Sequence, residues 1–116
     1  MTPTRTHALC AIYRRADDYP VVITIRSNSD LFNLLGYGAI RVSQIDDNLL
    51  AIFRADAYEN GEPLSLTHSY IEDDILCTKY IYGDVVVVGY DPELDEAISL
   101  TPNQLSRWLF TPEDLE

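Results

Sequence analysis

The chain is poor in the residues from which disulfide frameworks and zinc sites are built. Its 116 residues include two cysteines and two histidines. Cys10 and Cys77 lie far apart and match neither a CxxC motif nor a zinc-ligand spacing. We expect two small buried hydrophobic side chains in a reducing compartment, in preference to a disulfide. No secretory signal pattern and no apolar run of membrane-spanning length are visible, which predicts a cytoplasmic protein that does not enter a membrane.

The chain also lacks the short motifs of common catalytic centres. It contains no GxSxG, no HExxH and no glycine-rich phosphate loop. His7 and Cys10 fall on opposite faces of one expected strand, which is a poor geometry for a Cys–His pair. We therefore predict no catalytic residues and no cofactor. An enzyme that uses Cys10 or His68 stays open as an alternative, because active sites exist without a recognised motif.

A metal loop is excluded by the residues that follow its first carboxylates. Asp91, Glu93 and Asp95 alternate as at the start of a calcium-binding loop. Such a loop needs glycine at its sixth position and glutamate at its twelfth, where this chain has Glu96 and Pro102. We predict no metal site.

Basic residues are scarce in the second half of the chain, and acidic residues are abundant there. Through residue 54 the chain has six basic and five acidic residues, and from Ala55 onward it has two basic and fourteen acidic residues. The halves carry net charges of +1 and −12, which sum to the −11 of the whole chain. A half of this charge repels nucleic acid and anionic membranes, and it attracts a basic protein surface.

The first half of the chain predicts two β-hairpins joined by a short helix. Segments 7–13 and 20–26 read as paired strands, and 39–45 and 49–55 as a second pair with Ile40 and Val42 pointing inward. Between them, Ser27 or Ser29 can cap a helix that ends at Gly36.

The second half predicts strands and two helices around one buried strand. Segment 56–63 is a loop centred on Asn60-Gly61. Ser69 and Glu72 fit a capping box, which predicts a short helix over Tyr70 to Cys77. Val85 to Val88 are apolar on both faces of the expected strand, as in a central strand that is covered on both sides. Segment 97–100 is expected to pair antiparallel with this strand.

The last helix has the clearest local signals. Thr101 is the expected cap, Pro102 occupies the first helical position and Gln104 completes a capping box. The helix is expected to end at Thr111-Pro112. Its apolar stripe is Leu105, Trp108 and Leu109.

The expected fold class is α+β: an antiparallel, hairpin-rich sheet with short helices, including the C-terminal helix, packed on it. We expect one domain over residues 1–116, with a loose start at 1–6 and a loose tail at 111–116.

Four stretches of the chain resemble a known family. They are LFNLLGYGAIRV, PLSLTHSY, YIYGDVVVVGYD and ISLTPNQL, which begin at Leu31, Pro63, Tyr80 and Ile98. Together they resemble an uncharacterised family of small acidic proteins from phages and mobile elements of Gram-positive bacteria, a domain of unknown function. The family has no established activity. The resemblance implies a mobile-element context, in which small acidic proteins often inhibit host defence.

The acidic residues and tyrosines of the second half are the candidate binding residues. Carboxylates in loops can imitate phosphates and occupy an arginine-lined channel, and tyrosine is enriched at protein interfaces. We therefore expect an acidic non-enzymatic binding protein, an inhibitor of a CRISPR effector or a restriction enzyme that acts as a nucleic-acid mimic. The candidate partner-binding residues are Glu72, Asp73, Asp74, Asp91, Glu93, Asp95, Glu96, Tyr58 and Tyr70.

Two alternatives stay open at this stage. The acids would also serve solubility alone, since net charge keeps small proteins apart. The chain would then be a small self-associating interaction domain, and the sequence does not decide between a monomer and a homodimer. Direct nucleic-acid binding is not expected, because the chain has no arginine-rich stripe.

Overall fold

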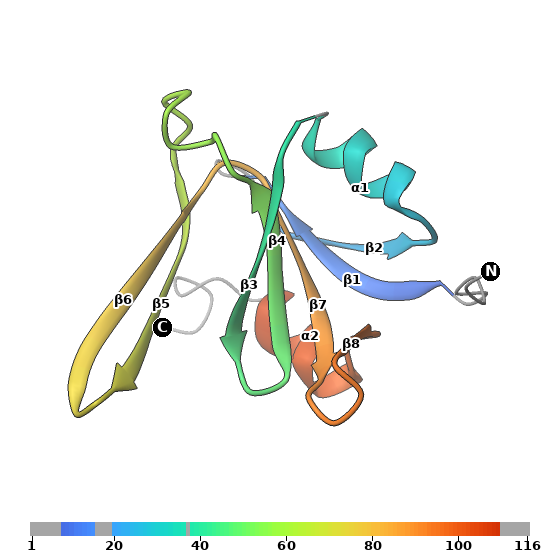
Figure 1. Cartoon of the computed structure of the whole chain (residues 1–116). Coiled ribbons are helices and arrows are strands. Elements are labelled where there is room, and N and C mark those ends of the chain that lie inside the picture. Colours follow the sequence, from blue (N-terminus) through green and yellow to red (C-terminus); the bar gives the residue numbers. More distant parts are fainter. Residues whose placement is uncertain (1–7, 16–19, 37, 110–116) are drawn as a thin grey trace.

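The computed structural model describes residues 8–15, 20–36 and 38–109. These residues form a six-stranded antiparallel sheet, a separate two-stranded sheet and two short helices (Figure 1). The strands are β1 (Leu9–Arg14), β2 (Val21–Ile25), β3 (Ile40–Asp46), β4 (Leu49–Arg54), β5 (Leu64–Glu72), β6 (Ile75–Tyr82), β7 (Val85–Asp91) and β8 (Glu96–Ile98). The helices are α1 (Asn28–Leu35) and α2 (Pro102–Leu109). Strands dominate over helices, so the fold is richer in β-structure than the predicted α+β class.

Strand β7 is the centre of the main sheet, as its four valines predict. The strand order is β2-β1-β7-β4-β3, and β8 also pairs with β7. Val85 to Val88 are at most 1% exposed, because both faces of β7 are covered. Strand β1 pairs with the first half of β7, and β8 pairs with its second half at Gly89 to Asp91.

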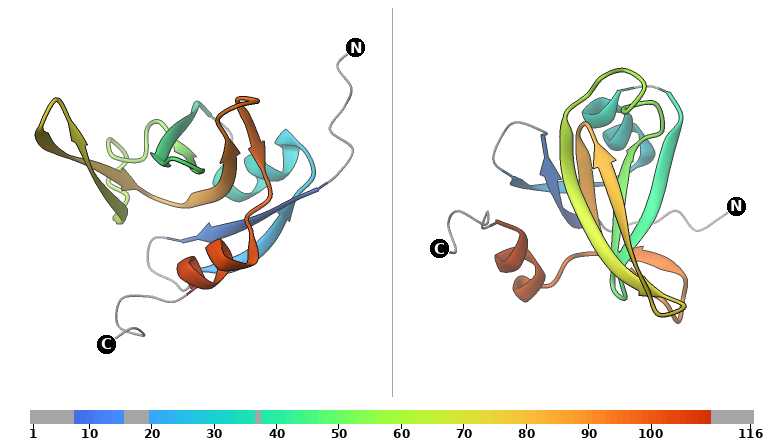
Figure 2. Two further views of the ribbon diagram at one scale, coloured as in Figure 1. Left: turned by 90° about the horizontal axis from the view of Figure 1, so that it is seen from below. Right: turned by 90° about the vertical axis from the view of Figure 1, so that its left-hand side faces the viewer.

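Two hydrophobic clusters lie on opposite faces of this sheet. Helix α1 covers one face, and the base of the β5–β6 hairpin together with α2 covers the other (Figure 2). The α1 face contains Leu9, Ala11, Ile25, Leu35, Ile52, Val86 and Val88. The opposite face contains Ile12, Ile45, Leu49, Ala51, Ile81, Val85, Val87 and Leu100.

The helix and hairpins of the first half are confirmed, with one correction in β3. Ser27 is the N-cap of α1, and Gly36 ends the helix at φ 89°, which favours glycine. Val42, expected to point inward, is 59% exposed. Ile45 reaches the core instead, on the face opposite to that of Ile40, and a β-bulge lies beside it between Gln44 and Asp46.

The helix predicted over Tyr70 to Cys77 is wrong, because this segment is the tip of a long hairpin. Strands β5 and β6 pair antiparallel and are joined by a two-residue turn. Asp73 and Asp74 have φ values of 53° and 64°, as a type I′ turn requires. Ser69, the expected cap, instead lies 3.2 Å from the hydroxyl of Thr78 on the opposite strand.

The local signals of α2 are confirmed where the structure describes them. The Thr101 N–H donates to Gln104 Oε1 at 2.8 Å, and the Gln104 N–H donates to Thr101 Oγ1 at 3.2 Å, which is a capping box. Leu105 packs against the core. The side chains of Trp108 and Leu109, the expected helix end at Thr111-Pro112, and the expected loose segments 1–6 and 111–116 lie outside what the structure describes.

Both cysteines are free, and the prediction that they are buried is wrong. Cys10 and Cys77 are half-buried. No helix of residues 8–15, 20–36 and 38–109 is long and apolar enough to cross a membrane.

The β5–β6 hairpin, residues 64–82, extends away from the main sheet as an arm (Figures 1 and 2). Its base is fixed by Ile81 and Leu66, which pack into the core. The tip, by contrast, leaves the body of the molecule. This geometry sets the position of the candidate site.

Candidate functional site

Three hairpin turns lie at the same end of the molecule and carry most of the predicted acids. The β3–β4, β5–β6 and β7–β8 turns all point toward the lower edge of Figure 1, and the second view in Figure 2 shows the same arrangement. The turns and the strand ends beside them contain no lysine or arginine. We call this surface the acidic end, and its carboxylates belong to Asp46, Asp47, Glu72, Asp73, Asp74, Asp91, Glu93, Asp95 and Glu96.

Some of these carboxylates shape their own turns. Asp91 Oδ1 accepts the backbone N–H groups of Glu93 at 3.0 Å and Leu94 at 3.4 Å. The Tyr90 hydroxyl donates to Asp95 Oδ1 at 2.7 Å, and this hydrogen bond raises the pKa of Tyr90. These acids therefore have a structural role that needs no partner.

Asp46 Oδ1 likewise accepts the backbone N–H of Asp47 at 2.8 Å. The other six carboxylates of the acidic end have no such role. Among the described residues, no hydrogen bond or ion pair reaches the side chains of Asp47, Glu72, Asp73, Asp74, Glu93 and Glu96. All six residues are exposed. Their charges are available to a binding partner.

The arm adds exposed apolar side chains beside these charges. Ile71, Ile75 and Leu76 flank the Asp73-Asp74 turn and are 67%, 64% and 68% exposed. The outer face of the arm continues from Ile71 and Leu76 to Tyr80, and it is exposed and uncharged along its length. An apolar patch bordered by polar groups is the usual composition of a protein interface.

The inner face of the arm is held against the main sheet by Lys79. Its Nζ donates to Ser43 Oγ at 3.0 Å and to the Gln44 carbonyl at 3.3 Å. The same ammonium lies 5.4 Å from the centre of the Tyr70 ring, which stacks on His68 at a centroid distance of 5.9 Å. Partial burial of its hydroxyl raises the pKa of Tyr70. These contacts fix the direction in which the arm points.

The structure brings most of the predicted site residues together, with one exception. The seven predicted acids lie at the acidic end, and Tyr70 lies on the arm that carries three of them. Tyr58 belongs to the β4–β5 loop at the other end, where its ring packs 4.9 Å from that of Tyr82. Tyr58 therefore does not share a surface with the predicted acids.

Sequence reasoning missed two parts of this surface. Asp46 and Asp47 lie in the first half of the chain, whose net charge of +1 gives no sign of an acidic surface. Ile71, Ile75 and Leu76 fall within the helix predicted over Tyr70 to Cys77, and this prediction gives no sign that they flank an exposed hairpin turn. The alternation of Leu64, Leu66 and His68 with polar residues was the available signal for a strand.

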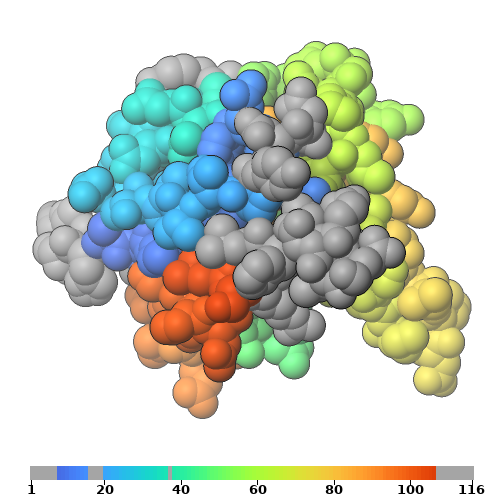
Figure 3. All heavy atoms as spheres, turned by 180° about the vertical axis from the view of Figure 1, so that it is seen from behind, coloured from blue at the N-terminus to red at the C-terminus, as the bar shows by residue number. Residues whose placement is uncertain are grey.

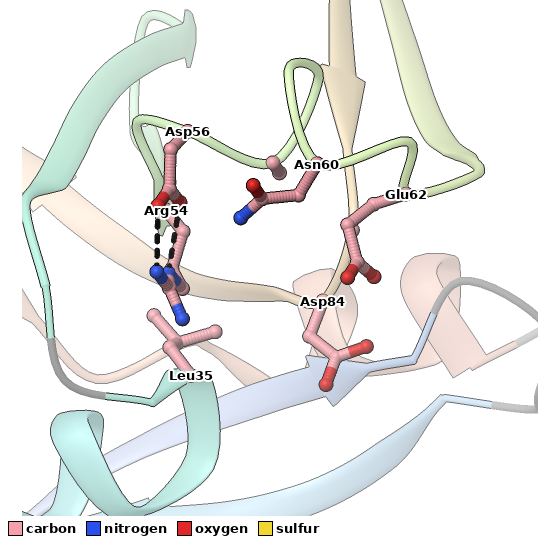
Figure 4. Close-up of a pocket in the computed structure, with 8 residues that line it drawn as sticks. Leu35, Arg54, Asp56, Asn60, Glu62 and Asp84 are labelled. Atoms are coloured by element: carbon pink, nitrogen blue, oxygen red, sulfur yellow. Dashed lines mark hydrogen bonds and ion pairs between the residues drawn. The ribbon is translucent and has the colours of Figure 1, made fainter.

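A small polar pocket of about 100 Å³ lies at the end opposite the acidic end (Figure 4). Arg54 binds Asp56 with two hydrogen bonds, of 3.0 and 2.7 Å, and this contact lowers the pKa of the Asp56 carboxyl. Glu62 and Asp84 also line the pocket (Figure 4). The pocket has room for a few water molecules.

Asp84 is also the partner of a tyrosine in β1. The Tyr13 hydroxyl donates to Asp84 Oδ2 at 2.7 Å. Burial and this hydrogen bond raise the pKa of Tyr13 to about 12. The contact joins β1 to the start of β7 and stabilises the centre of the sheet.

The described residues contain no cluster of three or more histidine, cysteine or acidic side chains that could hold a metal ion. Within the same ranges, the side chains of Cys10 and His68 have no hydrogen-bond partner that could act as a general base. Cys10 uses its backbone N–H, which donates to Ser99 Oγ at 2.9 Å. The acidic end presents carboxylates on its turns, beside the exposed apolar side chains of the arm.

Comparison of the chain with protein-family models, with curated proteins and with solved structures finds no match. The resemblance to a family of phage and mobile-element proteins therefore stays a prediction.

Proposed function

We propose that this protein is a non-enzymatic binding protein that docks its acidic end on a basic surface of another protein. The observation that carries the proposal is that three separate hairpins deliver nine carboxylates to one end of the molecule. Carboxylates that served solubility alone would not need to share one end.

The dense negative charge of the acidic end affects the rate of association, because it acts on a partner before the two proteins touch. A cluster of one sign steers an oppositely charged partner and raises the association rate. At about 0.1 M ionic strength the Debye length is about 10 Å, so neighbouring charges on one turn act together. The exposed apolar residues Ile71, Ile75 and Leu76 then supply the short-range contact that charge alone does not give.

The partner we propose is a host defence protein that handles nucleic acid, such as a CRISPR effector or a restriction enzyme. Such proteins hold the phosphate backbone with arginine and lysine. A row of exposed carboxylates offers the same charge as the phosphates and competes for the same channel. The resemblance to phage and mobile-element proteins supports this choice of partner.

The experiment is a cleavage assay with a panel of purified restriction enzymes and CRISPR effectors from Gram-positive bacteria. The full chain is added at low and at moderate salt, and DNA cleavage and DNA binding are both measured. We expect at least one enzyme to lose both activities, with weaker inhibition at higher salt because screening reduces the attraction. If no enzyme of the panel is inhibited at low salt, the proposal of a defence inhibitor is wrong.

The exposed face of the arm favours a second candidate function, self-association. Ile71, Leu76 and Tyr80 lie on one uncharged face of a two-stranded sheet, which two copies could bury against one another. Light scattering at low and high salt separates the candidates. A dimer that is stable at all salt concentrations favours self-association, and a monomer at all concentrations argues against it.

A further inference from the structure

One cavity of the described residues belongs to neither the acidic end nor the arm. It has a volume of about 490 Å³ and lies between α1 and the face of the main sheet that α1 partly covers. Six different elements each contribute one apolar side chain to its wall. These side chains are Leu9 of β1, Ile25 of β2, Leu31 of α1, Ile52 of β4, Val88 of β7 and Ala97 of β8.

The cavity has one polar side. Arg26, Ser27 and Asn28 complete its lining, and all three residues are exposed, which places them at the opening to solvent. The Ser27 side chain makes no capping hydrogen bond to α1. The Arg26 guanidinium forms no ion pair with any described residue, although the chain has a large excess of acids.

We propose that this cavity binds a small amphipathic molecule, with its apolar chain against the aliphatic wall and an anionic head group at Arg26. The wall and the volume match those of ligand pockets, which are mostly apolar with a few polar groups that fix orientation. An arginine recognises a carboxylate by paired N–H···O hydrogen bonds. A medium-chain fatty acid has this chemistry.

Charge selects the anionic head group over other polar ends. Asp30 is the acid closest in sequence to the opening, and its Oδ2 accepts the backbone N–H of Arg26 at 2.7 Å. This contact uses the backbone of Arg26 and leaves the guanidinium free to bind the ligand. A cationic amphiphile would face Arg26 directly and is expected to be excluded.

The test measures binding of decanoate, decanol and decyltrimethylammonium to the full chain by isothermal titration calorimetry. We expect decanoate to bind, decanol to bind about tenfold more weakly, and the cation not to bind. In the variant Arg26→Gln, decanoate affinity falls about tenfold while decanol affinity stays within about twofold. The matched control is Arg41→Gln, an exposed arginine on β3 outside the cavity, which leaves decanoate affinity unchanged.

Two filling variants locate the binding site. Ala97→Phe and Leu31→Trp add bulk from opposite walls, and either change is expected to abolish decanoate binding in a chain whose circular dichroism is unchanged. The proposal is overturned if decanoate does not bind, if the three ligands bind equally, or if both filled variants fold and still bind decanoate. These outcomes do not depend on the acidic end, so they leave the proposed function untouched.

Discussion

The ammonium group of Lys79 lies 3.0 Å from the hydroxyl of Ser43 and joins the arm to the edge strand of the main sheet. Beyond this point no described side chain connects the arm to β3 by a hydrogen bond. A lone two-stranded hairpin is marginally stable in water. The direction and order of the arm therefore depend on Lys79 and on the apolar base at Leu66 and Ile81.

Replacing Lys79 by methionine should loosen the arm and leave the main sheet intact. The change removes the hydrogen bonds to Ser43 and Gln44, each of which contributes about 0.5–1.5 kcal/mol. Hydrogen exchange of the β5 and β6 amides is expected to quicken while β7 stays protected. Ser43→Ala, which removes only one of the two contacts, should give a smaller effect. Unchanged exchange in the arm of the Lys79→Met variant would contradict this role.

The turn of the arm should tolerate removal of its charges. Asp73 and Asp74 hold positive φ values, a conformation that asparagine and glycine adopt more readily. Asp73→Asn together with Asp74→Gly is expected to raise the free energy of unfolding by about 0.5–1 kcal/mol in urea titrations. Asp73→Val together with Asp74→Val should lower it, and a stabilised valine variant would refute the turn type.

Tyr13 should make the protein less stable at high pH. Its pKa is about 12 in the folded chain against 10 in the unfolded chain, so the folded state retains the proton longer. The stabilisation is complete below pH 10 and is lost as the pH rises from 10 to 12. Urea unfolding across this range should show a shallower decline for Tyr13→Phe than for the unchanged chain. Parallel declines would show that Tyr13 does not titrate in this way.

The capping box should set the stability of α2. Thr101→Ala leaves the Gln104 N–H without its acceptor and is expected to destabilise the chain by about 1 kcal/mol. Gln104→Ala removes the reciprocal bond to the Thr101 N–H. Because the two side chains form one unit, the double variant should cost less than the sum of the single variants. Chemical denaturation of the three variants checks this, and strict additivity would speak against a coupled cap.

Local signals in the sequence predicted those elements whose chemistry is local. The Thr101–Gln104 cap, the Gly36 stop and the run Val85 to Val88 each identified their element correctly. The match of Ser69 and Glu72 to a capping pattern predicts a helix over Tyr70 to Cys77, whereas the pairing of β5 with β6 decides the conformation of this segment. Its strands are joined by two aspartates at positive φ, which the sequence does not mark as clearly as Asn-Gly would.

The sequence predicts most of the acidic residues of the candidate site. It does not predict that three hairpin turns present them at one end of the molecule. Carboxylates at turns are visible in the sequence, but whether three turns share one end depends on strand order. The antiparallel pairing of β4 with β7, in which Leu49 lies opposite Gly89, brings the β3–β4 turn beside the β7–β8 turn. This is a long-range pairing that no local pattern specifies.

The most direct test of the proposed function compares charge removal at the two ends of the molecule. The first variant combines Asp73→Asn with Asp74→Asn at the acidic end, and asparagine preserves the turn. Its matched control combines Glu59→Gln with Glu62→Gln in the β4–β5 loop, which lies at the other end. Figure 3 shows the molecule from behind, with the β7–β8 and β5–β6 turns again at the lower edge.

The measurement is the inhibition constant of each chain against the defence enzyme that the unchanged chain inhibits most strongly, at low and moderate salt. The account predicts that the acidic-end variant inhibits about tenfold more weakly at low salt and that the control inhibits like the unchanged chain. The difference should shrink as salt screens the charges. Equal loss in both variants, or no loss in the acidic-end variant, would contradict the claim that this end of the molecule binds the partner.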